Sequence, residues 1–112
     1  MTTSRLVADL EPPYYTAVFT SLRPDNPEGY AETSEHMQEI VKQIPGFLGY
    51  ESARTPGGIG ITVAYFRDEE SLTAWRQNAE HQSAQRRGRE QWYDAYSLHI
   101  GKVERSYSFE RE

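Results

Sequence analysis

Hydrophobic and polar residues alternate in four segments of the chain, and this period of two predicts four β-strands. Residues 14–22 (YYTAVFTSL) are rich in aromatic and β-branched side chains. Residues 47–54 (FLGYESAR) and 61–67 (ITVAYFR) flank the turn sequence TPGGIG, which favours a β-hairpin. Residues 96–109 alternate in the same way and complete the set of expected strands.

Two other segments follow the helical period. From Tyr30 onward, apolar residues recur at spacings of three and four, with acidic residues on the opposite face, until Pro45 and Gly46 end the segment. A second helix is expected after Asp68, a residue type that caps helix N-termini, with acidic residues in the first turn where the helix dipole favours them.

The apolar stripe of this second helix is out of phase with the next segment of the chain. Leu72, Trp75 and Ala79 form the expected buried stripe, and a further helical stretch covers residues 79–92. Along one unbroken helix, Trp75 and His81 would lie about 120° apart. We therefore expect a break near residues 78–79 that turns both side chains toward one cavity.

The order strand, helix, strand, strand, helix, strand predicts an α+β, ferredoxin-like βαββαβ fold. Its four-stranded antiparallel sheet would carry the helices on one face. The other face would carry apolar side chains such as Val18, Val63 or Tyr65, so a second copy of the chain is the expected cover, giving a homodimer. Residues 1–13 are expected to be a flexible N-terminal lead, and residues 14–112 a single domain.

Composition narrows the function classes. The 112 residues contain no cysteine, which excludes disulfides, thiolate metal sites and a thiol nucleophile. A net charge of −5 argues against nucleic acid as a partner. No apolar run approaches the roughly 18 residues of a membrane span. The N-terminal sequence lacks the apolar stretch of a secretory signal, so we expect a cytoplasmic protein without a membrane partner.

The motifs PGFLGYES and ITVAYFRDEESLTAWRQNAEHQSAQ make residues 14–109 resemble the antibiotic biosynthesis monooxygenase domain family of the dimeric α/β-barrel superfamily. The resemblance implies a dimeric α/β barrel. It also implies one of several functions, because the family includes oxygenases that convert polyketide phenols to quinones without metal or flavin. Other relatives bind and degrade haem, and many have no known role.

Two features argue against the haem-degrading branch. The resemblance aligns Trp75 with a pocket tryptophan of those relatives, and their axial histidine follows ten residues later, where this chain has Gln85. A neutral amide is a poor ligand for haem iron compared with imidazole. The first strand also lacks the asparagine that those relatives use. We therefore expect no haem and, because the three histidines are widely separated, no dedicated metal site.

The candidate site residues are few. His81 is the candidate general base, and Arg89 the candidate stabiliser of an anionic phenolate or enolate at the mouth of a pocket. Candidates for substrate contact are Trp75, Phe19, Tyr65 and Gln85. Each has a structural alternative: Trp75 as core, His81 as a residue at a helix start, and Arg89 with Arg86 and Arg87 as a solvated face. The aromatic residues 92, 93 and 96 are expected at a seam with a partner subunit.

Two function hypotheses are compatible with these residues. The first is a small monooxygenase that needs no cofactor and acts on a hydrophobic, aromatic small molecule. The second is a non-catalytic dimeric module that binds such a molecule. Oxygen consumption with hydroquinones would support the first hypothesis, and saturable binding without turnover would support the second.

Overall fold

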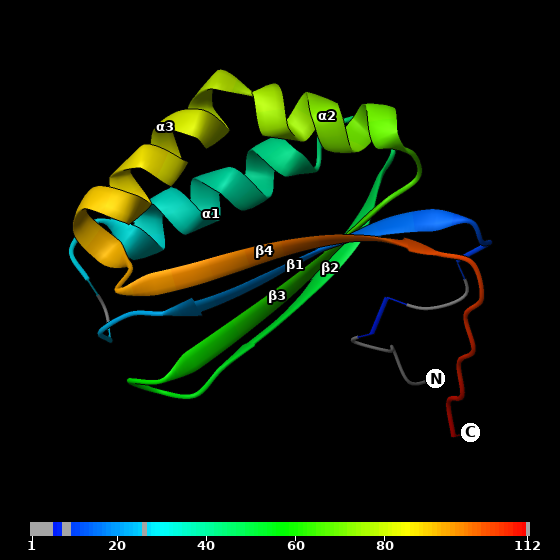
Figure 1. Ribbon diagram of the computed structural model, residues 1–112, viewed down its shortest axis with the longest axis horizontal. Helices are drawn as coiled ribbons and strands as arrows, with labels where there is room; N and C mark the ends of the chain where they lie inside the picture. The colour runs from blue at the N-terminus through cyan, green and yellow to red at the C-terminus, as the bar shows by residue number, and fades with distance from the viewer. Residues whose placement is uncertain (1–5, 8–9, 26, 112) are drawn as a thin grey trace.

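The computed structural model describes residues 6–7, 10–25 and 27–111. A layer of helices lies on one face of an antiparallel sheet (Figure 1). The elements in chain order are β1 (Tyr14–Leu22), α1 (Tyr30–Val41), β2 (Phe47–Arg54), β3 (Ile59–Phe66), α2 (Glu69–Gln77), α3 (Ala79–Arg87), a π-helix at Gly88–Trp92 and β4 (Ala95–Val103). This order confirms the ferredoxin-like α+β fold.

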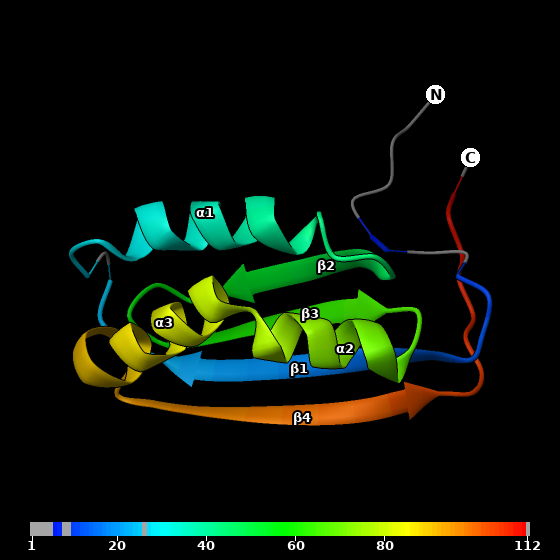
Figure 2. The same ribbon diagram turned by 90° about the horizontal axis from the view of Figure 1, so that it is seen from above.

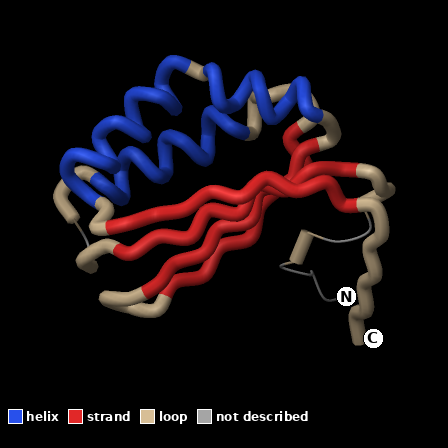
Figure 3. Tube along the Cα trace, in the orientation of Figure 1, coloured by secondary structure: helices blue, strands red, loops and turns tan. Residues whose placement is uncertain are grey.

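The strands are arranged in the order β2-β3-β1-β4. β1 is central, and it pairs with β4 from Tyr14↔Val103 to Leu22↔Ala95. The last strand was expected to reach residue 109, but it ends at Val103 because β1, its partner, begins at Tyr14. Residues 104–111 leave the sheet as a tail (Figure 3).

The core lies between the helices and the half of the sheet formed by β1 and β3. Phe66 at the end of β3 is fully buried, and Val41 of α1 and Trp92 of the π-helix are almost so. Seen from above, α1 runs beside β2 while α2 and α3 cross the middle of the sheet, which leaves β4 at an edge that the helices do not cover (Figure 2). This arrangement opens the helix-facing side along β4.

The opposite face of the sheet is largely uncovered. Val18 pairs with Val63 in register on this face, as the alternation predicted. Its exposed apolar side chains include Leu22, Ile59 and Ile61. Described residues near both ends of the chain contact this side of the sheet. There the Val7 amide donates to Glu51 at 2.9 Å, and the Tyr14 hydroxyl donates to Ser106 at 2.9 Å.

Within the described ranges, none of the helices combines the length and the apolar character needed to cross a membrane.

Candidate functional site

A largely apolar cavity of about 670 Å³ lies between the helix layer and the sheet. Strands β1, β3 and β4 form its floor, and α1, α2, α3 and the π-helix form its roof. The side chains on which its chemistry depends are Phe19, Tyr30, Trp75, His81, Gln85 and Tyr93. Leu98 and Ile100 of the edge strand complete the floor and remain about half exposed, so the cavity opens to solvent along β4.

The break between α2 and α3 shapes one end of the cavity. Asn78 adopts an extended conformation (φ −60°, ψ 124°), so the helix cannot continue through it. The Asn78 side chain then caps α3 by accepting from the His81 amide at 3.0 Å. The break confirms the expectation drawn from the phase of the apolar stripe, and it brings Trp75 and His81 to the same side.

Trp75 and His81 stack face to face. Their ring centroids are 3.9 Å apart and their planes differ by 12°. His81 Nδ1 donates to the Trp75 carbonyl at 3.0 Å, since a carbonyl oxygen can only accept. In the neutral imidazole this bond leaves Nε2 with its lone pair available. None of the described residues hydrogen-bonds to that nitrogen.

The surroundings of His81 favour the neutral ring. Burial lowers the pKa of His81, and the backbone hydrogen bond to Trp75 opposes this effect only in part. At neutral pH the imidazole is therefore uncharged and ready to accept a proton at Nε2. A neutral histidine held in one tautomer at an apolar cavity has the properties of a general base.

Several sequence-predicted residues meet at this cavity. Trp75, His81 and Gln85 line it from the roof, and Phe19 lines it from the floor. Arg89 lies outside the lining, on the exposed surface, and donates to the hydroxyl of Tyr96 at 3.2 Å. Since Tyr96 itself lines the cavity, Arg89 reaches this site only through that tyrosine.

Tyr65 is not brought to the cavity. On β3 the cavity-facing residues are Thr62, Ala64 and Phe66, so Tyr65 points to the opposite face of the sheet. There its ring packs against Tyr14, with centroids 6.0 Å apart, and its hydroxyl donates to Glu51 at 2.6 Å. Burial, together with the bond to Glu51, raises the pKa of Tyr65 to about 12. The placement of Tyr65 at the cavity was therefore wrong.

The sequence interpretation missed the aromatic end of the cavity. Trp92 was expected at a subunit seam, but it is 4% exposed within one chain, and its indole Nε1 donates to the Glu28 carbonyl at 2.9 Å. Tyr93 places its ring edge-on to Phe19, with centroids 5.4 Å apart. Gly88 allows this packing, because an added Cβ at that position would lie 2.7 Å from the Tyr93 ring.

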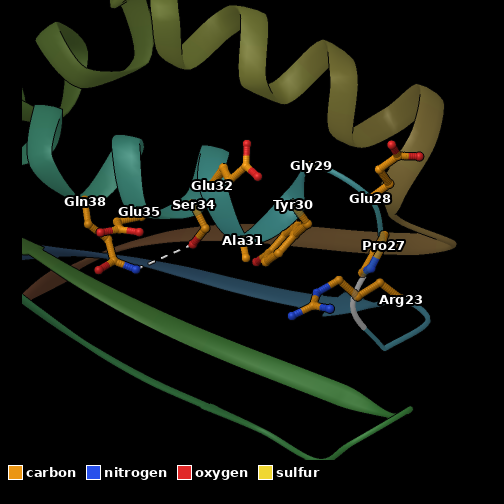
Figure 4. Close-up of a pocket in the computed structure, with 10 residues that line it drawn as sticks. All are labelled: Arg23, Pro27, Glu28, Gly29, Tyr30, Ala31, Glu32, Ser34, Glu35 and Gln38. Carbon is orange, nitrogen blue, oxygen red and sulfur yellow. Dashed lines mark hydrogen bonds between the residues drawn. The ribbon is translucent and has the colours of Figure 1, made fainter.

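A second hollow, of about 500 Å³, lies on the surface at the start of α1. Figure 4 shows that Tyr30 extends from α1 toward the sheet and that the Arg23 side chain lies beside it. Tyr30 lines both this hollow and the main cavity. The part of the chain that the structure describes contains no cluster of three or more histidine or acidic side chains placed to hold a metal ion.

Comparison with known proteins identifies the family. The family model described as antibiotic biosynthesis monooxygenase matches residues 13–87. An uncharacterized protein of Bacillus subtilis, YqjZ, is 43% identical over 100 residues, which cover 89% of this chain and 88% of that protein. The jasmonate monooxygenase of Pyricularia oryzae is 32% identical over 87 residues, covering 75% of this chain but only 40% of that protein.

Solved structures share the fold. SnoaB, a cofactor-independent oxygenase from Streptomyces nogalater, superposes with a TM-score of 0.72 over 85% of this chain and 97% of that one. Sequence identity is only 10%, so this likeness concerns the fold alone.

Proposed function

The chain belongs to the antibiotic biosynthesis monooxygenase family, and we propose from this that it oxygenates a hydrophobic, aromatic small molecule without metal or flavin. The observation that carries the proposal is His81, a neutral histidine held in one tautomer against Trp75 at an apolar cavity. The sequence similarity to a jasmonate monooxygenase is in line with oxygenation of a small molecule.

The reaction begins with proton removal. His81 Nε2 accepts the proton of a phenolic hydroxyl, which leaves an electron-rich anion. The ring carbon para to that oxygen gives electrons to O₂ and forms a C–O bond. The protonated His81 returns its proton to the distal oxygen, giving a hydroperoxide. Cleavage of the O–O bond and loss of the hydrogen on the same carbon then yield a quinone and water, so the substrate supplies all the electrons.

The other cavity residues hold the substrate. Trp75 and Phe19 present aromatic surface to a flat ring, and Gln85 offers an amide one turn from His81. Arg89 acts through Tyr96, whose hydroxyl it contacts at 3.2 Å. Burial of the substrate here would keep water away from the carbanion-like intermediate.

The proposal includes a homodimer joined through the uncovered face of the sheet. Leu22, Ile59 and Ile61 are exposed there, and the described helices lie on the opposite face. Packing of two such sheets would place one cavity in each protomer, on the outer side of the joined sheets.

Oxygen uptake with a panel of polycyclic phenols that carry a hydrogen on the para carbon tests the proposal. With ¹⁸O₂, the expected product carries one labelled oxygen and the second appears as labelled water. His81→Ala should abolish this turnover, whereas His36→Ala, a histidine on the outer surface of α1, should keep the wild-type rate. Saturable binding of the panel with no oxygen uptake would instead support the non-catalytic binding module.

A further inference from the structure

The cavity has a second polar end, remote from Trp75 and His81. Tyr30 from the start of α1 and Tyr93 after the π-helix meet there at right angles, with ring centroids 6.0 Å apart and planes at 89°. Both rings line the cavity. Tyr93 also packs edge-on against Phe19, which fixes its position above the floor.

Two arginines lie close to these tyrosines. The Arg23 guanidinium carbon lies 3.9 Å from the centre of the Tyr30 ring. Arg54 extends from β2 across the helix-facing side of the sheet, where it donates to the Ser21 hydroxyl and, at 2.8 Å, to the Gly58 carbonyl. A side chain at position 60 would collide with the Arg54 guanidinium, so Gly60 is the residue that lets Arg54 cross β3.

Neither arginine has a carboxylate partner within 4 Å among the described residues. Arg23 Nε is buried there without a hydrogen-bond acceptor. The chain has 17 acidic and 12 basic residues, so acidic partners are not scarce. Two half-buried arginines without an acidic partner are therefore unexpected. Their only hydrogen-bond acceptors among the described residues are neutral: Ser21 and Gly58 for Arg54, and the Pro24 carbonyl at 3.2 Å for Arg23. Because no anion balances either charge, this end of the cavity favours a negatively charged group.

The phenols are suited to donate to such a group. Burial and a hydrogen bond to Tyr30 raise the pKa of Tyr93 above its ordinary value, so its hydroxyl keeps its proton. Arg54 lies at the same end of the cavity, because Ser21, which accepts its hydrogen bond, pairs with Tyr96 in the sheet, and the Tyr96 ring lies 5.8 Å from the Tyr93 ring. A protonated tyrosine hydroxyl with positive charges nearby is a favourable arrangement for binding a carboxylate.

We propose that Tyr30, Tyr93, Arg23 and Arg54 form a subsite for the carboxylate of an elongated apolar substrate. The proposal rests on the proposed function, because it names the class of molecule that His81 would oxidise. Six residues of α3 and the five-residue π-helix separate His81 from Tyr93, so the two positions lie more than two helical turns apart along the chain. A ligand that reaches both ends is therefore long, with its reactive ring at His81 and its acid at Tyr93.

Calorimetric titration with 4-biphenylacetic acid and its amide tests the subsite without requiring turnover. The two probes share size and shape and differ in charge. We expect the wild-type protein to bind the acid at least tenfold more tightly than the amide. Tyr93→Phe and Arg54→Gln should each weaken binding of the acid about tenfold and leave binding of the amide unchanged. Arg105→Gln, in the exposed C-terminal tail, removes the same charge away from the cavity and should change neither affinity.

Equal binding of acid and amide by the wild-type protein would overturn the proposal, as would failure of the acid to bind at millimolar concentration. An Arg105→Gln effect as large as that of Arg54→Gln would also overturn it, because the preference would then reflect overall charge. Tyr93→Phe keeps the ring contacts with Phe19, so it remains informative if Arg54→Gln does not fold. If the protein prefers the acid to the amide but consumes no oxygen, only the oxygenase proposal is overturned. If it consumes oxygen but binds acid and amide equally, only the carboxylate subsite is overturned.

Discussion

His81 is fixed by two contacts with the same residue. Its ring stacks on the Trp75 indole, and its Nδ1 donates to the Trp75 carbonyl. The stack removes one face of the imidazole from water, and the hydrogen bond determines which nitrogen carries the proton. Protonation at Nε2 would place a positive charge in this apolar setting. The same contacts that prepare His81 as a base therefore make its protonated form unfavourable.

This cost predicts a pH dependence of stability. Because burial lowers the pKa of His81, the folded protein binds fewer protons there than the unfolded chain does. The stabilisation of the folded state by neutral His81 is fully present above about pH 6.5, the ordinary pKa of histidine. It is lost as the pH falls through the lower pKa of His81 in the folded protein. His81→Gln should remove this slope, so urea denaturation at pH 7.5 and pH 5 should show a smaller drop for the variant.

Other charged groups lie near His81, so the pH dependence of stability needs a control variant. Glu80, the neighbour of His81, pairs with His36 of α1 at 3.0 Å, and both side chains are about 60% exposed. Arg76 and Glu69 of α2 also border the cavity. His36→Gln should leave the slope attributed to His81 in place. Parallel pH profiles for the wild-type protein and His81→Gln would contradict the prediction.

A conservative substitution separates the ligand-binding role of Trp75 from its structural role. Trp75→Phe keeps an aromatic ring beside His81, and we expect a loss of about 1 kcal/mol in the free energy of unfolding. Affinity for an aromatic ligand should fall because stacking area is lost. Trp92→Phe is the comparison: Trp92 is almost fully buried and bonds to the Glu28 carbonyl, so it should cost more stability. A larger stability loss at Trp75 than at Trp92 would mean that Trp75 is mainly core.

At the scale of the elements, the junction of α2 and α3 determines the geometry of the site. Asn78 ends one helix and caps the next through the His81 amide. Asn78→Ala should therefore cost about 1 kcal/mol of stability, the usual value of an N-cap. Asn78→Asp keeps the acceptor and should stay near wild type in the same denaturation experiment. An alanine variant as stable as wild type would show that the cap contributes nothing.

The sequence could predict this junction because the apolar stripe changes phase there, and phase is visible in the order of residues. The four strands could be predicted from alternation for the same reason. The aromatic end could not. Tyr93 enters the cavity because the π-helix at Gly88–Trp92 adds a residue per turn and redirects the chain beyond it. Arg54 reaches the same end from another strand, and only tertiary packing over Gly60 brings it there.

At the scale of the whole molecule, the sheet has one face covered by helices and one largely open. Apolar side chains on the open face, among them Ile59 and Ile61, are about half exposed in the single chain. A stable protein interface buries about 800 Å² on each partner. A second copy related by a two-fold axis presents the same residues, so the open faces of the two copies can cover each other.

Ile61→Glu tests this interface. We expect the wild-type protein to scatter light as a particle of twice the 12.9 kDa chain mass, and the variant to scatter as a monomer, because a charge on the open face would be buried in the interface without a partner. Ile100→Glu is the matched control. Ile100 is 55% exposed against 44% for Ile61, yet it borders the cavity on the helix-facing side, so that variant should remain dimeric. A wild-type monomer at micromolar concentration would contradict the dimer itself. A dimer lost in Ile100→Glu but kept in Ile61→Glu would place the contact elsewhere than on the open face.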